Sequence, residues 1–387
     1  MRIQSVHAAA VTQPAALGRK ASGFDQALVS SSMNPMGDDA RYEDCGALFR
    51  PPWDDVACVV TAEDGSWGFG MSSHAGPSVP LINDYLGPMI VGLNTSDVEH
   101  AWDVMAKGGG SHLGLSGVLS YAISAVDLAL WDLLGKQESV PVYELLGGPS
   151  RSALDCYATG SDIGAYVDAG FGAVKLPCPW GSDVEAASTL NVDRFTNARR
   201  MVGLDVPIRV DGWAIQSASD AIALGELLAP HGVDWIEDYV FPEDWAAYAE
   251  VRRALPNVRL ASGERWYGVA PFRLAIEQGY VDIVQPDALW VGGVTPTRRI
   301  AALAQSSGIE LALHCAGNDP YGQHLGVALA ANTVSEMYYG GPIPEDLMAT
   351  FRPLPGMGPV VDGTIVPSDA PGFGIDLKLS DIERATA

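Results

Sequence analysis

The chain has 387 residues, of which 48% are hydrophobic and 18% are charged, a composition typical of a folded globular protein. Its 47 acidic and 23 basic residues give a net charge of −24. This charge argues against binding to nucleic acid or to an anionic membrane, because both need a basic surface. The five cysteines form no Cys-x-x-Cys pair, so we expect neither a disulfide framework nor a zinc ribbon, and we predict a cytoplasmic location.

The first part of the chain predicts a mixed domain of strands and helices. Alternating residues at 3–11 and 55–70 indicate strands, and Glu-Asp-Gly at 63–65 is a hairpin turn signal. Apolar residues then recur at helical spacing over 96–107 and 118–136. A Gly- and Pro-rich stretch at 145–153 marks the expected boundary. We therefore predict an α+β capping domain over residues 1–148.

From residue 149 onward the pattern changes to a repeat of short strand, loop and helix. Eight candidate strands are separated by helical segments: LDCYATG, AVKLP, PIRVDG, DWIEDY, RLASGE, DIVQPD, ELALHC and VSEMYYG. The repeat predicts an α/β fold with a closed, TIM-like (β/α)8-type barrel over residues 149–350. An open doubly wound sheet is the alternative, but no glycine-rich dinucleotide fingerprint follows the first strand. Residues 351–387 are expected to return to the capping domain.

Most of these strands end in an ionisable residue. Strands two to seven end in Lys175, Asp211, Glu237, Glu264, Asp287 and His314, and strand eight carries Glu336. From Asp211 onward the spacings are 26, 27, 23, 27 and 22 residues, each close to one β/α unit. Because the C-terminal ends of barrel strands meet at one face, where active sites lie, these side chains are expected to converge.

Three successive carboxylates in this set indicate a metal site. A single acid after a strand is usually a turn former or a helix cap. Asp211, Glu237 and Glu264 together would repel one another unless a positive group neutralised them. Their all-oxygen chemistry suits a hard cation, Mg²⁺ or Mn²⁺. Such an ion would also let an anionic substrate approach an acidic protein.

The same motifs resemble the mandelate racemase subgroup of the enolase superfamily, and in particular its acid-sugar dehydratases. The resemblance rests on IRVDGW, WIEDYV, ASGE, IVQPD and LALHC in this order, preceded by ISAVDLALWDLLGK and PVYELLGG. It implies a barrel capped by a domain built from both chain ends, with Mg²⁺ on the three carboxylates. It also implies that His314, oriented by Asp287, removes the proton α to a substrate carboxylate.

The resemblance further separates two reaction outcomes. Racemases of this subgroup carry Lys-x-Lys on the second barrel strand, whereas this chain has Lys175 followed by Pro177 at the second position. That favours a dehydratase in which His314 takes the C2 proton of an aldonate and returns it to the departing 3-hydroxyl, giving a 2-keto-3-deoxy acid. Lys175 would add positive charge, or act as a second base in the alternative, a racemase, epimerase or cycloisomerase.

Substrate contacts are assigned to Glu336, which matches a strand-eight glutamate of the dehydratases, and to Arg41 in the first capping loop. That loop lacks the histidines of the resembled dehydratases, and Arg265 and Trp266 follow Glu264 where those enzymes have histidine. The identity of the sugar therefore stays open, as do the roles of His74 and His112. From another enzyme class, a metal-free barrel glycosidase with two carboxylates would not need His314 beside Asp287. We expect a homo-oligomer that binds a small acid sugar.

Overall fold

The capping region contains a three-stranded antiparallel sheet covered by helices. The computed structural model describes residues 1–17, 51–178, 184–213, 217–348 and 353–387. The sheet has the order β1 (Ile3–Ala10), β2 (Val56–Ala62) and β3 (Trp67–Ser72). The predicted hairpin joins β2 to β3, and Gly65 has a positive φ of 84° at the turn, a conformation that glycine adopts without strain. The other elements of this region are η1 (Pro14–Leu17), α2 (Ala75–Pro80), η3 (Leu81–Leu86), α3 (Gly87–Ile90), α4 (Val98–Leu113), α5 (Gly117–Glu138) and α6 (Val142–Leu145).

Helix α5 is the central element of the capping region, because it packs on the sheet and also contacts the barrel. Most of its residues are buried, and Gly68 and Gly70 of β3 allow close approach, since a Cβ at Gly70 would lie 2.1 Å from the Ala125 carbonyl oxygen. Among the described residues, α5 is the one helix that is long and apolar enough to cross a membrane. However, 78% of its most apolar window is buried inside the protein.

The barrel comprises eight parallel strands, in agreement with the eight sequence candidates. Seven of them are neighbours in chain order, and β11 pairs with β4 through Glu336 and Tyr157. Leu311 on β10 pairs with Asn332, just before β11, which closes the ring. The strands are β4 (Leu154–Thr159), β5 (Ala173–Pro177), β6 (Ile208–Asp211), β7 (Val233–Glu237), β8 (Leu260–Ser262), β9 (Ile283–Val284), β10 (Glu310–Leu311) and β11 (Ser335–Tyr338).

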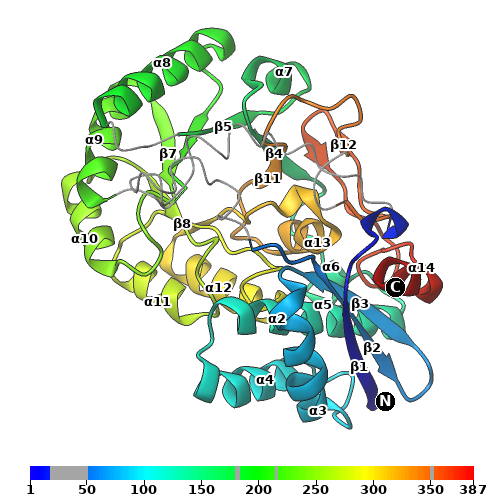
Figure 1. Cartoon of the computed structure of the whole chain (residues 1–387). Helices are drawn as coiled ribbons and strands as arrows, with labels where there is room; N and C mark the ends of the chain where they lie inside the picture. Colours follow the sequence, from blue (N-terminus) through cyan, green and yellow to red (C-terminus); the bar gives the residue numbers. More distant parts are fainter. Residues whose placement is uncertain (18–50, 179–183, 214–216, 349–352) are drawn as a thin grey trace.

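Helices surround this ring of strands on the outside (Figure 1). They are α7 (Ile163–Asp168), α8 (Val184–Val202), α9 (Ala218–Leu228) with η4 (Ala229–His231), α10 (Trp245–Ala254), α11 (Ala270–Glu277), α12 (Val294–Ser307), and η5 (Ala316–Asn318) with α13 (Pro320–Ala328). After β11, the strand–helix repeat is interrupted. Among the described residues this strand is followed by the hairpin β12 (Val360–Val361) and β13 (Thr364–Ile365), and α14 (Leu379–Thr386) is the next helix.

Side chains fill the barrel interior. Tyr157 and Trp235 belong to a small interior cluster with one residue from each of five strands and Ala312, which directly follows β10. The Arg209 guanidinium lies 3.7 Å from the centre of the Trp235 ring and pairs with Asp234. The interior is thus a packed core rather than a channel, and the space for a ligand lies at the C-terminal ends of the strands.

The capping region is held to this end of the barrel by buried hydrogen bonds that join α5 to the loop after β9 and to the first turn of α12. Asp127 accepts hydrogen bonds from the Thr295 amide and hydroxyl, at 3.0 and 2.7 Å. Ser124 accepts one from the Gly292 amide at 2.9 Å. The C-terminal segment also contacts α5, because Asp132 of α5 accepts a hydrogen bond from the Phe373 amide. Asp132 accepts a second hydrogen bond from the Phe69 amide of β3. These contacts place the capping region over the barrel mouth.

Candidate active site

The strand-end residues named from the sequence surround one cavity at the barrel mouth. The cavity has a volume of about 360 Å³, within the range of small-molecule sites. Asp211, Glu264, His314 and Glu336 line its floor. Lys175 and Glu237 lie beneath them and are each 1% exposed. Strands separated by more than a hundred residues therefore bring these groups together, as the β/α spacing predicted.

Lys175 is the positive centre of the buried part of the site. Its ammonium pairs with Glu237, with Glu336 at 2.9 Å and with Asp211 at 3.3 Å. Although burial works against the charged form, these carboxylates raise the pKa of Lys175 well above its ordinary value. The lysine is therefore protonated and fully engaged in ion pairs.

One lysine does not satisfy the surrounding negative charge. Burial, together with the neighbouring carboxylates, raises the pKa of Asp211 to about 6 and that of Glu237 to about 7, in spite of the attraction of Lys175. Glu237 also accepts hydrogen bonds from Trp235 and Gln285. A buried carboxylate whose pKa stays raised beside a lysine is short of positive charge. The donor set of Asp211, Glu237 and Glu264 therefore fits a hard divalent cation.

His314 and Asp287 form a hydrogen-bonded pair at the edge of the cavity. His314 Nδ1 lies 2.7 Å from Asp287 Oδ2, and Asp287 Oδ1 accepts from the Leu289 amide at 2.7 Å. The carboxylate is thus fixed from both sides, and its acceptor oxygen selects the His314 tautomer with a proton on Nδ1. The other nitrogen, Nε2, is left to face the carboxylates of the cavity.

The environment of Nε2 is strongly negative. It lies 2.9 Å from Glu264 Oε2 and 3.8 Å from Glu336 Oε2. Burial lowers the pKa of His314, but Cys315, Glu264 and the hydrogen bond to Asp287 outweigh it and raise the pKa well above the ordinary value. Glu264 is in turn held ionised: burial opposes this, but His314 and Arg265 keep its pKa well below the usual range.

Glu336 is buried between the lysine and the histidine. Its Oε1 accepts from the Thr159 hydroxyl at 2.5 Å, and its Oε2 accepts from the Cys315 amide at 3.0 Å. Burial favours the neutral acid, yet Lys175 and His314 lower the pKa of Glu336 to about 2. An ionised carboxylate thus borders the cavity beside His314 Nε2.

The rest of the cavity lining includes the aromatic residues Tyr121, Tyr267 and Trp290, which local sequence patterns did not single out. Tyr121 of α5 contacts the Tyr267 hydroxyl at 3.0 Å, and its ring lies 4.8 Å from that of His74 and 6.1 Å from that of Trp290. Each is a plausible core aromatic by composition, and no motif distinguishes them; the fold alone brings them together. Arg265 also lines the cavity and pairs with Glu264 at 3.0 Å.

Arg41, which was assigned to a substrate contact, lies outside the described residues. Of the two histidines whose roles stay open, His112 is exposed near the end of α4, whereas His74 lines the cavity.

Comparison with known families places this architecture. Residues 160–382 match the enolase C-terminal domain-like family, and residues 55–147 match the N-terminal domain of mandelate racemase and muconate lactonizing enzymes. The chain belongs to the mandelate racemase and muconate lactonizing enzyme family of the enolase superfamily. The resemblance inferred from the motifs and the prediction of a capped barrel are confirmed.

The chain is also similar to individual proteins of known name. The L-rhamnonate dehydratase of Saccharopolyspora erythraea is 35% identical over 323 residues, which cover 82% of each chain. The rhamnonate dehydratase of Gibberella zeae, whose crystal structure is a complex with Mg, is 26% identical, with a TM-score of 0.85 over 99% of this chain and 95% of that one. The 3,6-anhydro-D-galactonate cycloisomerase of Zobellia galactanivorans is also 26% identical, with a TM-score of 0.73 over 86% and 94%.

These relationships make the chain an enzyme of a family that includes sugar-acid hydro-lyases, with Mg²⁺ as the family's cofactor. The cofactor prediction is thereby confirmed.

Proposed function

We propose that this enzyme is a Mg²⁺-dependent aldonate dehydratase. It would remove the C2 proton α to the substrate carboxylate and eliminate the 3-hydroxyl, giving a 2-keto-3-deoxy sugar acid. The observation that carries the proposal is the His314–Asp287 pair, whose second nitrogen, Nε2, faces a cavity lined by Asp211, Glu264 and Glu336.

The metal site is assigned to Asp211, Glu237 and Glu264, in agreement with their residue types and with the shortage of positive charge at Asp211 and Glu237. When bound there, Mg²⁺ would supply a Lewis acid for the second negative charge that develops on the substrate carboxylate. Lys175 supports the same charge balance from beneath, because it pairs with Asp211 and Glu237.

Proton transfer is assigned to His314. A cation on Glu264 would offset the carboxylate that raises the pKa of His314, leaving Nε2 neutral. Nε2 then takes the C2 proton, while Asp287 holds the Nδ1 proton in place and stabilises the imidazolium that forms. The same imidazolium then donates the proton to the leaving 3-hydroxyl, the C3–O bond breaks and water departs. The resulting enol becomes the 2-keto acid. Glu336 is placed to accept a hydrogen bond from a substrate hydroxyl.

The position of Lys175 supports one-sided chemistry over racemisation. A second base would have to be neutral and exposed to the ligand. Lys175 is instead buried, and three ion pairs keep it protonated. Pro177, at the place of the second lysine in the racemases, has no proton-transferring group. The alternative of a racemase, epimerase or cycloisomerase would require a different group on the opposite face of the substrate.

The test is a panel of aldonates. The first is L-rhamnonate, because rhamnonate appears in the names of the similar dehydratases. Each acid is incubated with the Mg²⁺-loaded enzyme and assayed for 2-keto-3-deoxy products. At least one acid should give the keto product with the wild type and with His100→Asn, a control on the surface of α4. His314→Asn should give none while still binding Mg²⁺. Equal turnover by His314→Asn would exclude His314 as the base.

A further inference from the structure

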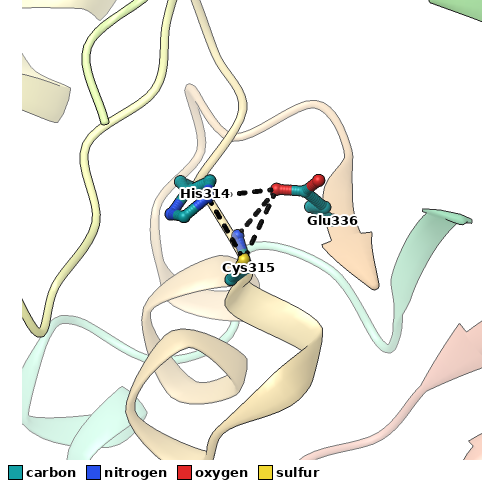
Figure 2. A group of neighbouring side chains, drawn as sticks. All are labelled: His314, Cys315 and Glu336. Atoms are coloured by element: carbon teal, nitrogen blue, oxygen red, sulfur yellow. Dashed lines mark hydrogen bonds and ion pairs between the residues drawn. The ribbon is translucent and has the colours of Figure 1, made fainter. Parts of the chain in front are cut away.

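Cys315 occupies an unusual position directly after the proposed base. Its backbone has a φ of 51°, a conformation that non-glycine residues adopt rarely and that clusters at active sites. The Cys315 amide donates to Glu336 Oε2, and the residue lines the cavity. Figure 2 shows its sulfur beside the His314 ring and the Glu336 carboxylate. The thiol therefore belongs to the polar floor of the cavity.

The three side chains present nitrogen, sulfur and oxygen at separations that suit one metal ion. Cys315 Sγ lies 3.3 Å from His314 Nε2 and 3.7 Å from Glu336 Oε2, and the last two atoms are 3.8 Å apart. Tetrahedral Zn²⁺, with bonds of about 2.0–2.3 Å, needs ligand atoms about 3.3–3.6 Å apart. The three atoms thus form one face of a nearly correct tetrahedron. Within the described ranges, no other group of three His, Cys, Asp or Glu residues brings its ligand atoms within 4.8 Å of one another.

The chemistry of this group differs from that of the proposed Mg²⁺ site. Mg²⁺ prefers oxygen ligands, whereas thiolate and imidazole favour Zn²⁺ and similar softer ions. The group has one ligand of each of the three types that Zn²⁺ binds in proteins. A Zn²⁺ ion would displace the proton of the Cys315 thiol and any proton on His314 Nε2, and both would pass to solvent. Nε2 would also give up its 2.9 Å contact with Glu264.

We propose that His314, Cys315 and Glu336 form a second metal site, selective for Zn²⁺-like ions, which overlaps the base of the enzyme. Occupancy blocks the nitrogen that accepts the substrate proton, so Zn²⁺ inhibits the Mg²⁺-loaded enzyme. The binding site stands on the geometry alone, whereas the inhibition rests on the proposed role of His314.

Cobalt titration tests the site without any assay of turnover. Co²⁺ replaces Zn²⁺ at such sites, and a thiolate–cobalt bond produces a near-ultraviolet charge-transfer band. With excess Mg²⁺ present, we expect this band at one Co²⁺ per chain in the wild type and in Cys156→Ser, a control on β4. The band should be absent from Cys315→Ser and Cys315→Ala, and Zn²⁺ should remove it from the wild type. A wild type without the band, or a Cys315 variant that keeps it, would overturn the proposal.

Two further variants separate this proposal from the proposed function. Asp211→Asn removes an assigned Mg²⁺ ligand and should keep the cobalt band, because the band requires only the thiolate site. For turnover, the Zn²⁺ concentration that halves the wild-type rate should rise at least about tenfold in Cys315→Ser. Equal inhibition of both would place the inhibitory Zn²⁺ on the carboxylates instead. If no aldonate is turned over, the dehydratase assignment fails while the cobalt result still stands.

Discussion

Replacing Asp287 by Asn should abolish catalysis while leaving the fold intact. The asparagine has two possible orientations, and neither reproduces the carboxylate. If its amide nitrogen faces His314, it donates to Nδ1, so the remaining imidazole proton moves to Nε2, which can no longer accept the substrate proton. If its oxygen faces His314, the amide nitrogen opposes the Leu289 N–H, now 2.7 Å from Asp287 Oδ1. Two opposed donors cost about 1–3 kcal/mol, so the first orientation is favoured.

The expected loss follows from this change of tautomer. A base held in the wrong tautomer loses about 10⁴ in kcat in the serine-protease triad, and we expect a fall of about 10³–10⁴ here. That corresponds to about 4–5.5 kcal/mol of barrier height. The assay is kcat/KM for keto-acid formation, with Mg²⁺ affinity and the thermal unfolding midpoint as controls. Asp168→Asn, exposed on α7, is the matched surface variant. A loss smaller than about tenfold in a stable, Mg²⁺-binding protein would refute the assignment of the pair.

Three further variants test how buried polar groups contribute to stability. Lys175→Met leaves three buried carboxylates unpaired and should lower the free energy of unfolding in metal-free protein by about 3–5 kcal/mol in urea titrations; a change below about 1 kcal/mol would contradict the ion-pair account. His324 is buried in α13, where its ring lies 5.4 Å from that of Phe373. Burial lowers the pKa of His324 to about 3, below its value near 6.5 in the unfolded chain. The stability that its neutral form provides is therefore complete above pH 6.5 and is lost as the pH falls. Between pH 7 and 5 the free energy of unfolding of the wild type should therefore fall by about 2 kcal/mol more than that of His324→Leu. Equal falls in the two proteins would show that protonation of His324 does not set this pH dependence. Asp132→Ala deprives the buried amides of Phe69 and Phe373 of their acceptor and should cost about 2–5 kcal/mol, measured by thermal unfolding; an unchanged midpoint would show that these amides find other partners.

The barrel was predictable from the sequence because its signal is repeated. Each strand candidate is short, but an ionisable residue recurs at one β/α spacing from Asp211 to Glu336, and the structure brings these residues to one cavity. Even β9 and β10, which are only two residues long, carry Asp287 and His314 just beyond their ends. The family motifs span these same positions, so the order of the groups in the chain was sufficient to indicate the site.

The remaining features depend on tertiary contacts that leave no local pattern. Tyr121 faces the cavity only because α5 crosses the barrel mouth, and Cys315 joins the floor only through its left-handed backbone. Lys175 was expected to add positive charge near the substrate, whereas the structure buries it beneath the carboxylates. The role of Arg41, the domain boundaries, the cytoplasmic location and the homo-oligomer stay predictions.

The fate of the C2 hydrogen tests the central claim most directly. The substrate found in the aldonate panel is incubated with the Mg²⁺-loaded enzyme in D₂O and followed by NMR and mass spectrometry. A dehydratase in which His314 moves the C2 proton gives a 2-keto-3-deoxy acid that has lost water, and substrate deuterated at C2 should show a primary isotope effect on its formation. Recovery of intact substrate, deuterated at C2 with no loss of water, would contradict this account and would identify a racemase or epimerase.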